Sequence, residues 1–158
     1  WYFTPELALR STELKRVLIF NCSGERAGQL FLETLLETAA SRTVLASYEI
    51  EHPGFLFNHV IFCTNVTTPE ALESSVKKAE RETVTSLTVQ REFAEAWKRL
   101  VPGFKDENSR VVLMIQDAVD LVEKIYESGR ELDVLVMGSL HLVGGLIGVA
   151  KLEESALS

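Results

Sequence analysis

The sequence predicts an α/β fold of the Rossmann-like type, with a mostly parallel sheet flanked by helices. Four short apolar stretches rich in β-branched or aromatic residues recur along the chain without polar alternation, as in strands that are covered on both faces. Segments with helical spacing of apolar residues lie between them, and this alternation indicates an α/β architecture. A chain of 158 residues with 46% hydrophobic content is long enough for one domain with its own core.

The first half of the chain contains two of the predicted strands. Residues 16–21 (RVLIFN) form the first strand, and an apolar stripe predicts a helix over about residues 26–40. Residues 58–64 (NHVIFCT) form the second strand. Thr68 and Pro69 then predict a helix start, because a hydroxyl is favoured at the N-cap and proline at the first helical position.

Two different segments follow that helix start. Residues 70–86 are heavily charged, and we interpret them as a solvated insertion. Residues 87–101 place Phe93, Trp97 and Leu100 on one helical face. An aromatic stripe at helical spacing is typical of the core, so this segment is predicted to be a helix that packs on the sheet.

The last third of the chain contains the remaining strands. Residues 110–114 (RVVLM) and 133–137 (DVLVM) are the third and fourth predicted strands. A helix is predicted between them over about residues 116–128, with Gly129 placed to cap it. A last helix is predicted from Leu140 onward.

The apolar run over residues 134–150 also raises the possibility of a membrane span. Gly144 and Gly148 form a Gly-x-x-x-Gly pattern, but the run is shorter than the ~20 residues that a span needs and lacks aromatic or basic flanks. We therefore favour strand, turn and helix, with no membrane partner. Glycine in a helix costs about 1 kcal/mol relative to alanine. We therefore expect Gly144, Gly145 and Gly148 to pack closely against the sheet or a neighbouring helix.

Composition excludes several classes of function. Sixteen basic residues against 23 acidic ones give a net charge of −7, and no basic cluster with interleaved aromatics is present, so no nucleic-acid partner is expected. Cys22 and Cys63 lie far apart in apolar runs, and we interpret them as reduced core thiols. No signal peptide is visible, and the opening residue Trp1 suggests that the chain is cut from a larger protein.

The turns after the first and last strands are the candidate binding sites, because ligands of open α/β sheets bind beyond the carboxyl ends of the strands. After the last strand, Ser139 either caps the helix or contacts a bound carboxylate or phosphate. His141 is either a structural first-turn residue, which we favour, or a second polar group at the same place. After the first strand, Ser23 and Gly24 make a tight turn.

Arg26 follows that turn and offers a fork-shaped cation for a phosphate or an acid. The turn is neither a Gly-x-Gly-x-x-Gly nor a Walker pattern, so a self-standing dinucleotide or P-loop site is not supported. The last turn is not a nucleophile elbow, which disfavours hydrolase chemistry.

Several of these stretches resemble the eukaryotic, fungal-like folylpolyglutamate synthases. DVLVMGSLHLVGG is similar to the strand, turn and helix that carry a G-S-L-H-L-V-G run in that family. RVLIFNCSGER is similar to the first strand and turn of the same domain, although Glu25 and Ala27 replace the two acids of the usual Asp-Arg-Asp. HVIFCTN, LTVQREFAEAWKRL and RVVLMIQDAVDLV are also similar, so the resemblance extends from Arg16 to Lys151.

The resemblance implies a single Mur-ligase-type C-terminal domain over residues 1–158, from an enzyme that uses ATP and Mg²⁺ to add L-glutamate to the γ-carboxyl group of a folate. It implies that Ser139 and His141 bind glutamate and that Ser23, Gly24 and Arg26 contact the nucleotide. It places no catalytic residue and no metal ligand in this chain, because the P-loop, the metal ligands and the catalytic lysine of the family belong to an N-terminal ATPase domain.

The same resemblance implies that this N-terminal domain is a partner in cis and that the chain alone is inactive. The parent enzyme would work in the cytoplasm, in the mitochondrion or in both. An alternative of a different class stays open, in which the chain is a freestanding, non-catalytic α/β module that acts as a regulator or interaction partner. The length of the native polypeptide distinguishes the ligase domain from the freestanding module.

Overall fold

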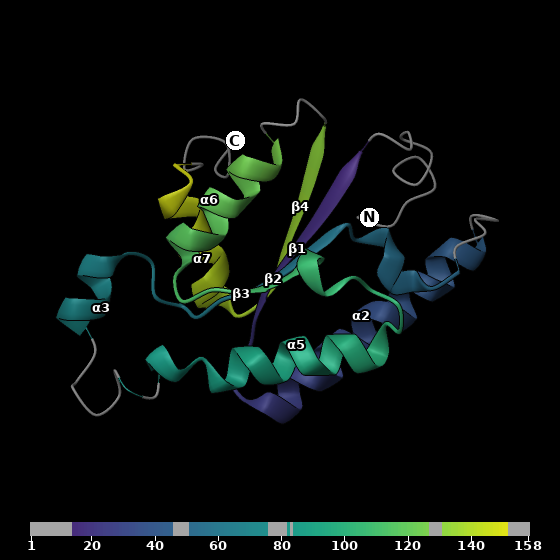
Figure 1. Ribbon diagram of the computed structural model, residues 1–158, viewed down its shortest axis with the longest axis horizontal. Coiled ribbons are helices and arrows are strands. Elements are labelled where there is room, and N and C mark those ends of the chain that lie inside the picture. The colour runs from purple at the N-terminus through teal and green to yellow at the C-terminus, as the bar shows by residue number, and fades with distance from the viewer. Residues whose placement is uncertain (1–13, 46–50, 76–81, 83, 127–130, 152–158) are drawn as a thin grey trace.

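The computed structural model of the protein describes residues 14–45, 51–75, 82, 84–126 and 131–151 (Figure 1). The elements in chain order are β1 (Lys15–Asn21), α2 (Glu25–Leu45), η1 (Pro53–Leu56), β2 (His59–Phe62), α3 (Pro69–Ser75), α5 (Thr88–Leu100), η2 (Asp106–Asn108), β3 (Ser109–Val111), α6 (Ile115–Tyr126), β4 (Leu132–Gly138) and α7 (Leu140–Val149).

The four strands form one parallel sheet in the order β3-β2-β1-β4. Strand β1 lies in the middle, with Phe20 opposite Phe62 of β2 and opposite Met137 of β4. The pairing of β1 with β4 continues to the last residue of each strand, where Asn21 lies opposite Gly138. The predicted α/β class with a parallel, Rossmann-like sheet is confirmed.

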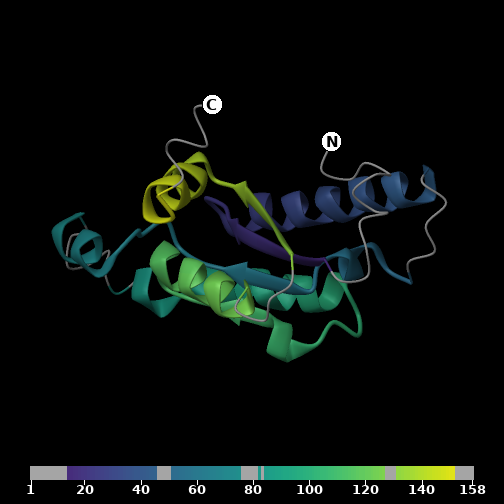
Figure 2. The ribbon, with the colours of Figure 1, turned by 90° about the horizontal axis from the view of Figure 1, so that it is seen from above.

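Helices cover both faces of the sheet. Buried side chains of α2 and α5 pack with Leu18 and Phe20 on one face, whereas buried side chains of α6 and α7 pack with Val17 and Ile19 on the other. Figure 2 shows α2 and α7 near the half of the sheet formed by β1 and β4, and α5 and α6 near the half formed by β2 and β3. The alternating residues of β1 therefore belong to two separate cores.

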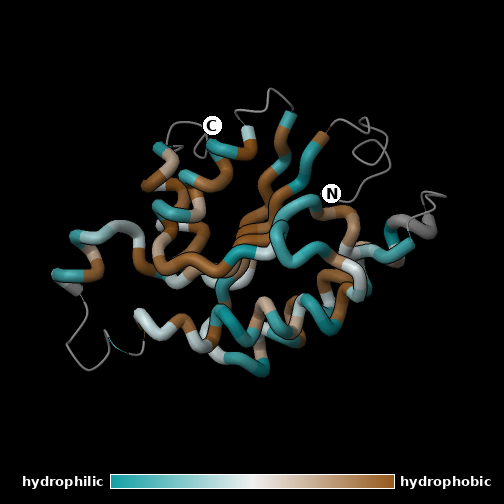
Figure 3. Tube along the Cα trace, viewed as in Figure 1, coloured by the Kyte–Doolittle hydropathy of each residue, from teal (hydrophilic) through white to brown (hydrophobic). Residues whose placement is uncertain are grey.

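Aromatic side chains fill the core between the sheet and helices α2 and α5. The Phe93 ring meets the Phe20 ring edge to face, with centroids 5.2 Å apart, and Trp97 meets Phe57 at 6.0 Å. Each buried side chain of this size stabilises the fold by about 1.5–3 kcal/mol relative to an exposed one. Figure 3 shows the hydrophobic residues concentrated along the strands, as expected for a sheet covered on both faces.

The third strand is shorter than predicted. It ends at Val111, whereas the apolar pattern extends to residue 114. The Leu113 carbonyl accepts the Thr64 hydroxyl, and the Met114 N–H donates to a carboxylate oxygen of Asp117, 3.0 Å away, at the start of α6. Backbone hydrogen bonds to the β2 segment continue past Val111, because the Val112 N–H donates to the Phe62 carbonyl at 2.9 Å and the Thr64 N–H donates to the Leu113 carbonyl at 3.3 Å. The turn into α6 begins at Met114.

The middle of the chain largely follows its sequence pattern. Helix α5 is confirmed as a helix packed on the core, because Phe93 and Trp97 are each 1% exposed. The Thr68 hydroxyl accepts the Ala71 N–H at 3.4 Å at the start of α3, as predicted. Helix α2 continues five residues beyond the predicted end, to Leu45. The proposed cap Gly129 and part of the charged insertion lie outside the described residues.

The expectation that all three glycines of α7 pack closely was wrong for two of them. A Cβ atom added at Gly144 or Gly148 would meet no atom within 4 Å, whereas one at Gly145 would lie 2.6 Å from Cδ1 of Ile115. Only Gly145 therefore allows a close helix approach. Among the helices of the described ranges, none combines the length and apolarity of a bilayer-crossing segment.

Candidate functional site

Strands β1 and β4 create a topological switch point at the carboxyl edge of the sheet. The two strands are hydrogen-bonded neighbours, yet α2, which follows β1, and α7, which follows β4, cover opposite faces. Ligands of open α/β sheets bind where the connections diverge in this way. The topology thus brings the turn with Ser23 and Gly24 and the turn with Ser139 to the same edge, as the sequence predicted for strand ends.

Gly138 shapes the turn that leads into α7. Its φ angle of +113° lies in a region that side chains rarely adopt, and a Cβ atom at this position would collide with the backbone carbonyl group of Asn21. The close approach of these two strand ends therefore requires glycine. It also fixes the direction in which Ser139 enters the helix.

Ser139 is the N-cap of α7. Its hydroxyl oxygen accepts the His141 N–H at 3.2 Å, which satisfies one of the unpaired donors of the first turn. The structure thus confirms the capping role that the sequence left open for Ser139, and it does not test the ligand contact. The His141 side chain is exposed, as is Leu140 at 87%.

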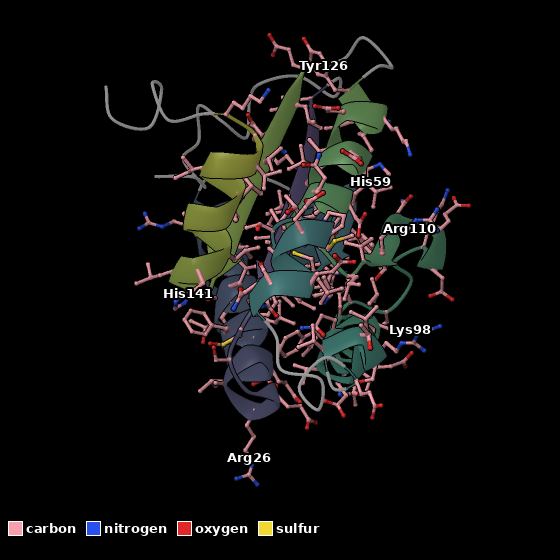
Figure 4. All side chains as sticks on the ribbon, turned by 90° about the vertical axis from the view of Figure 1, so that its left-hand side faces the viewer. Arg26, His59, Lys98, Arg110, Tyr126 and His141 are labelled. Atoms are coloured by element: carbon pink, nitrogen blue, oxygen red, sulfur yellow. The ribbon has the colours of Figure 1, made fainter. Side chains whose placement is uncertain are left out.

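The turn after β1 holds the other predicted residues. Gly24 has a φ angle of +102°, and its carbonyl accepts the Gly28 N–H in the first turn of α2. Ser23 and Gly24 line the pocket described next. Arg26 is exposed and points away from the body of the molecule, and His141 projects from α7 at a separate place (Figure 4). The structure therefore does not bring Arg26 and His141 together.

A pocket of about 530 Å³ lies beside the switch point, at the carboxyl ends of β1 and β2. This volume is typical of small-molecule sites. Thr67 connects the pocket to α7, because its methyl group also lies 3.1 Å from the position of a Cβ atom at Gly145. The pocket is lined by Asn21, Cys22, Ser23, Gly24, Thr64, Asn65, Val66, Thr67, Ala71, Val84, Thr88, Val89 and Gln90.

Three carboxamides form a hydrogen-bonded chain along this lining. Gln90 Nε2 donates to Asn21 Oδ1 at 3.0 Å, and Asn21 Nδ2 donates to Asn65 Oδ1 at 2.9 Å. Asn21 and Gln90 are only 5% and 8% exposed. The three side chains come from β1, from the loop after β2 and from the first turn of α5, so tertiary packing assembles the chain.

The sequence analysis missed Asn65 and Gln90 as candidate site residues. A signal for Gln90 was present, because it shares a helical face with Phe93 and Trp97, three and seven positions later, and that face is buried. A polar residue on a buried stripe needs a hydrogen-bond partner. Asn65 carries no comparable local signal, since it lies in a loop.

The described lining of the pocket is uncharged. The two cysteines are free: Cys22 is half-buried at the pocket, and Cys63 is fully buried at the end of β2. Burial, together with the charge of Asp117, raises the pKa of the Cys63 thiol to about 12. Cys63 is therefore a protonated core thiol, as predicted.

Comparison with known proteins finds relatives along nearly the whole chain. It is 31% identical to the folylpolyglutamate synthase of Neurospora crassa over 154 residues, which cover 94% of this chain and 27% of that protein. It is 31% identical to the folylpolyglutamate synthase of Saccharomyces cerevisiae strain YJM789 over 147 residues, 89% of this chain and 23% of the relative. The chain thus spans about a quarter of the length of these relatives. No family model and no solved structure match it.

Proposed function

We infer that this chain, which is a homologue of the fungal folylpolyglutamate synthases along nearly its whole length, is the C-terminal domain of such a ligase. The homology is the observation that carries the proposal. The parallel sheet with helices on both faces is the Rossmann-like fold that such a domain would have. The remaining three quarters of a protein of that length would supply the ATPase domain in cis.

The reaction that we propose for the whole protein joins L-glutamate to the γ-carboxyl group of a folate. ATP would phosphorylate that carboxylate, and the glutamate amine would attack the acyl phosphate and release phosphate. The protein's work in such a reaction is to position the reactants and to neutralise their charges. Mg²⁺ would be held mainly by the N-terminal domain, as the resemblance implies, and we assign no Mg²⁺ ligand to this chain.

We assign Ser139 and His141 to the incoming glutamate. The first turn of α7 presents backbone N–H groups and a positive dipole end at the carboxyl edge of the sheet, which favours a carboxylate. The Ser139 oxygen accepts the His141 N–H, and its hydroxyl proton has no acceptor within the part of the chain that the structure describes. A carboxylate of the incoming glutamate would accept a hydrogen bond from the Ser139 hydroxyl group. We assign Ser23, Gly24 and Arg26 to the nucleotide.

Replacing Ser139 in a complete ligase that carries this domain tests the assignment. Ser139→Ala is expected to raise the KM for glutamate about tenfold with little change in kcat, because a hydrogen bond to a charged group contributes about 1.5–3 kcal/mol. Ser139→Gly separates this effect from capping, since glycine at an N-cap costs only a few tenths of a kcal/mol. Both variants should raise the KM, and Ser139→Thr should not. Unchanged kinetics in Ser139→Ala would leave Ser139 as a helix cap only.

The size of the native polypeptide tests the domain assignment. An antibody raised against this chain should detect a protein several times larger than 17.7 kDa in the source cells. A band at 17.7 kDa would favour the alternative of a freestanding, non-catalytic module. We also propose that the 158 residues alone are inactive and bind ATP too weakly for calorimetry; micromolar binding would contradict this.

A further inference from the structure

Another cavity lies at the amino edge of the sheet, at the other end of the strands from the switch point. His59 is the first residue of β2 and Arg110 the second residue of β3, whereas the turns with Ser23 and Ser139 follow the last residues of β1 and β4. This amino-edge cavity has a volume of about 170 Å³. It is lined by His59, Ile61, Glu107, Arg110, Leu121, Lys124 and Ile125.

Three basic side chains from three different elements meet at the amino-edge cavity. His59 comes from β2, Arg110 from β3 and Lys124 from the last turn of α6. The strand register places Arg110 beside Ile61, whose side chain packs in the core on the α6 side of the sheet. Figure 4 shows His59 and Arg110 on the same side of the molecule. The three basic groups are therefore brought together by the fold and not by their spacing in the sequence.

Two of these groups are cations without a counterion. Neither Arg110 nor Lys124 forms an ion pair with another residue in the described ranges, although the chain as a whole has a net charge of −7. The carboxylate in the lining, Glu107, lies 4.0 Å from the Lys105 ammonium group, which offsets part of its charge. The helix dipole alone favours a lysine in the last turn of α6. It does not account for Arg110 at the same cavity.

An anion in this cavity would find both positive charge and hydrogen-bond donors. Arg110 offers a fork of N–H groups, Lys124 an ammonium group, and the uncharged ring of His59 one N–H. A phosphate group has oxygens pointing in more directions than a planar carboxylate, which suits donors that come from three elements. One side of the cavity is apolar, and the reduced contact with water there strengthens the attraction between charges. This apolar side consists of Ile61, Leu121 and Ile125.

We propose that the amino-edge cavity binds a phosphate group, held by Arg110, Lys124 and His59. The group belongs either to free phosphate or to a larger phosphorylated molecule. Because the cavity lies at the opposite edge of the sheet from Ser23 and Ser139, this phosphate is not that of the nucleotide proposed for the switch point. A bound phosphate would hold β2, β3 and α6 together and would thus stabilise the domain. The inference goes beyond the proposed ligase function and does not depend on it.

Titration of the 158-residue chain with inorganic phosphate and with glycerol phosphate, followed by NMR of the histidine rings, tests the inference. The His59 signals should shift saturably with a Kd on the order of 1 mM. The pKa of His59 should rise, because the anion offsets the charges of Lys15 and Arg110. His52 lies outside the lining and should not respond. The probe that binds more tightly identifies the source of the phosphate group. A shift of His59 no larger than with sodium chloride at equal ionic strength would overturn the proposal.

Two exposed positions allow the cations to be removed with little risk to the fold. Arg110→Gln and Lys124→Gln should each weaken phosphate binding at least about fivefold, and Arg110→Lys, which keeps the charge but loses the fork, should weaken it less than Arg110→Gln does. Arg99→Gln is the matched control, because it removes one exposed charge from α5 outside the lining, and it should leave the affinity unchanged. Equal affinity in all four variants, or an equal loss with Arg99→Gln, would overturn the proposal.

Discussion

The last residue of β4, Gly138, lies directly against the backbone carbonyl group of Asn21, the last residue of β1. This contact joins the two turns of the switch point. Asn21 leads to Ser23 and Gly24 and also carries the central carboxamide of the pocket, whereas Gly138 leads to the N-cap Ser139. One backbone contact therefore positions both candidate sites.

Gly138→Ala is expected to destabilise the protein. The new methyl group would collide with a backbone atom that cannot rotate away, and alanine would be held at a φ angle of +113°. Such backbone strain costs about 1–3 kcal/mol. The free energy of unfolding, measured by urea denaturation, should fall by about 2 kcal/mol or more.

Gly144→Ala is the matched control for that substitution. Gly144 lies inside α7, where a Cβ atom would meet nothing within 4 Å. Alanine should therefore stabilise the protein by up to about 1 kcal/mol, the difference in helix propensity. Equal effects of the two substitutions would show that the contact between Gly138 and Asn21 has no special role.

The packing of α2 against α5 gives a second prediction. A Cβ atom at Gly28 would overlap the Phe93 ring, which is 1% exposed and held by Phe20. Gly28→Ala should thus lower the stability by about 1–3 kcal/mol, as overpacking does, although alanine is the better helix former. In the background of Phe93→Leu the same substitution should cost much less. A double-mutant cycle of unfolding free energies measures this coupling, and additive effects would contradict it.

The strands and the packed helix α5 could be predicted from local patterns. The strands of a sheet covered on both faces are continuous apolar runs, and Phe93 and Trp97 recur at helical spacing. The strand-end rule also found the turns with Ser23 and Ser139. It could not find the pocket, since Gln90 reaches Asn21 only after α5 has packed across the end of β1. The sequence pattern also could not show that Gly144 and Gly148 face open space. The surroundings of these two glycines depend on which side of α7 packs against α6.

The two cysteines should differ in reactivity. The thiolate is the nucleophile in alkylation, and burial raises the pKa of Cys63 to about 12, so this thiol should resist iodoacetamide in the folded protein. Cys22 is half-buried at the pocket and should be labelled first. Mass spectrometry of partly labelled protein, with Cys22→Ser as the control, measures the order. Equal labelling of both thiols without denaturant would contradict the buried position of Cys63.

His59 should make the stability depend on pH. It lies half-buried at the start of β2, where burial first, and then the charges of Lys15 and Arg110, lower its pKa. Glu107 and Lys124 line the same small cavity. When the pH falls below the ordinary histidine value of about 6.5, the unfolded chain takes up a proton before the folded one. The unfolded state then binds more protons, so stability should decrease from the unfolded pKa down to the lower folded pKa and level off below it.

His59→Gln removes this titration and is the test. Urea midpoints of the wild type and the variant, measured from about pH 7.5 down to about pH 5, should diverge as the pH falls, because only the wild type loses the stability linked to the His59 proton. At neutral pH, where the His59 imidazole is uncharged, the urea midpoints of the wild type and the variant should differ by a constant amount. Parallel midpoint curves over the whole range would mean that His59 takes up its proton equally easily in the folded and unfolded chains, so that burial and the charges of Lys15 and Arg110 together do not lower its pKa.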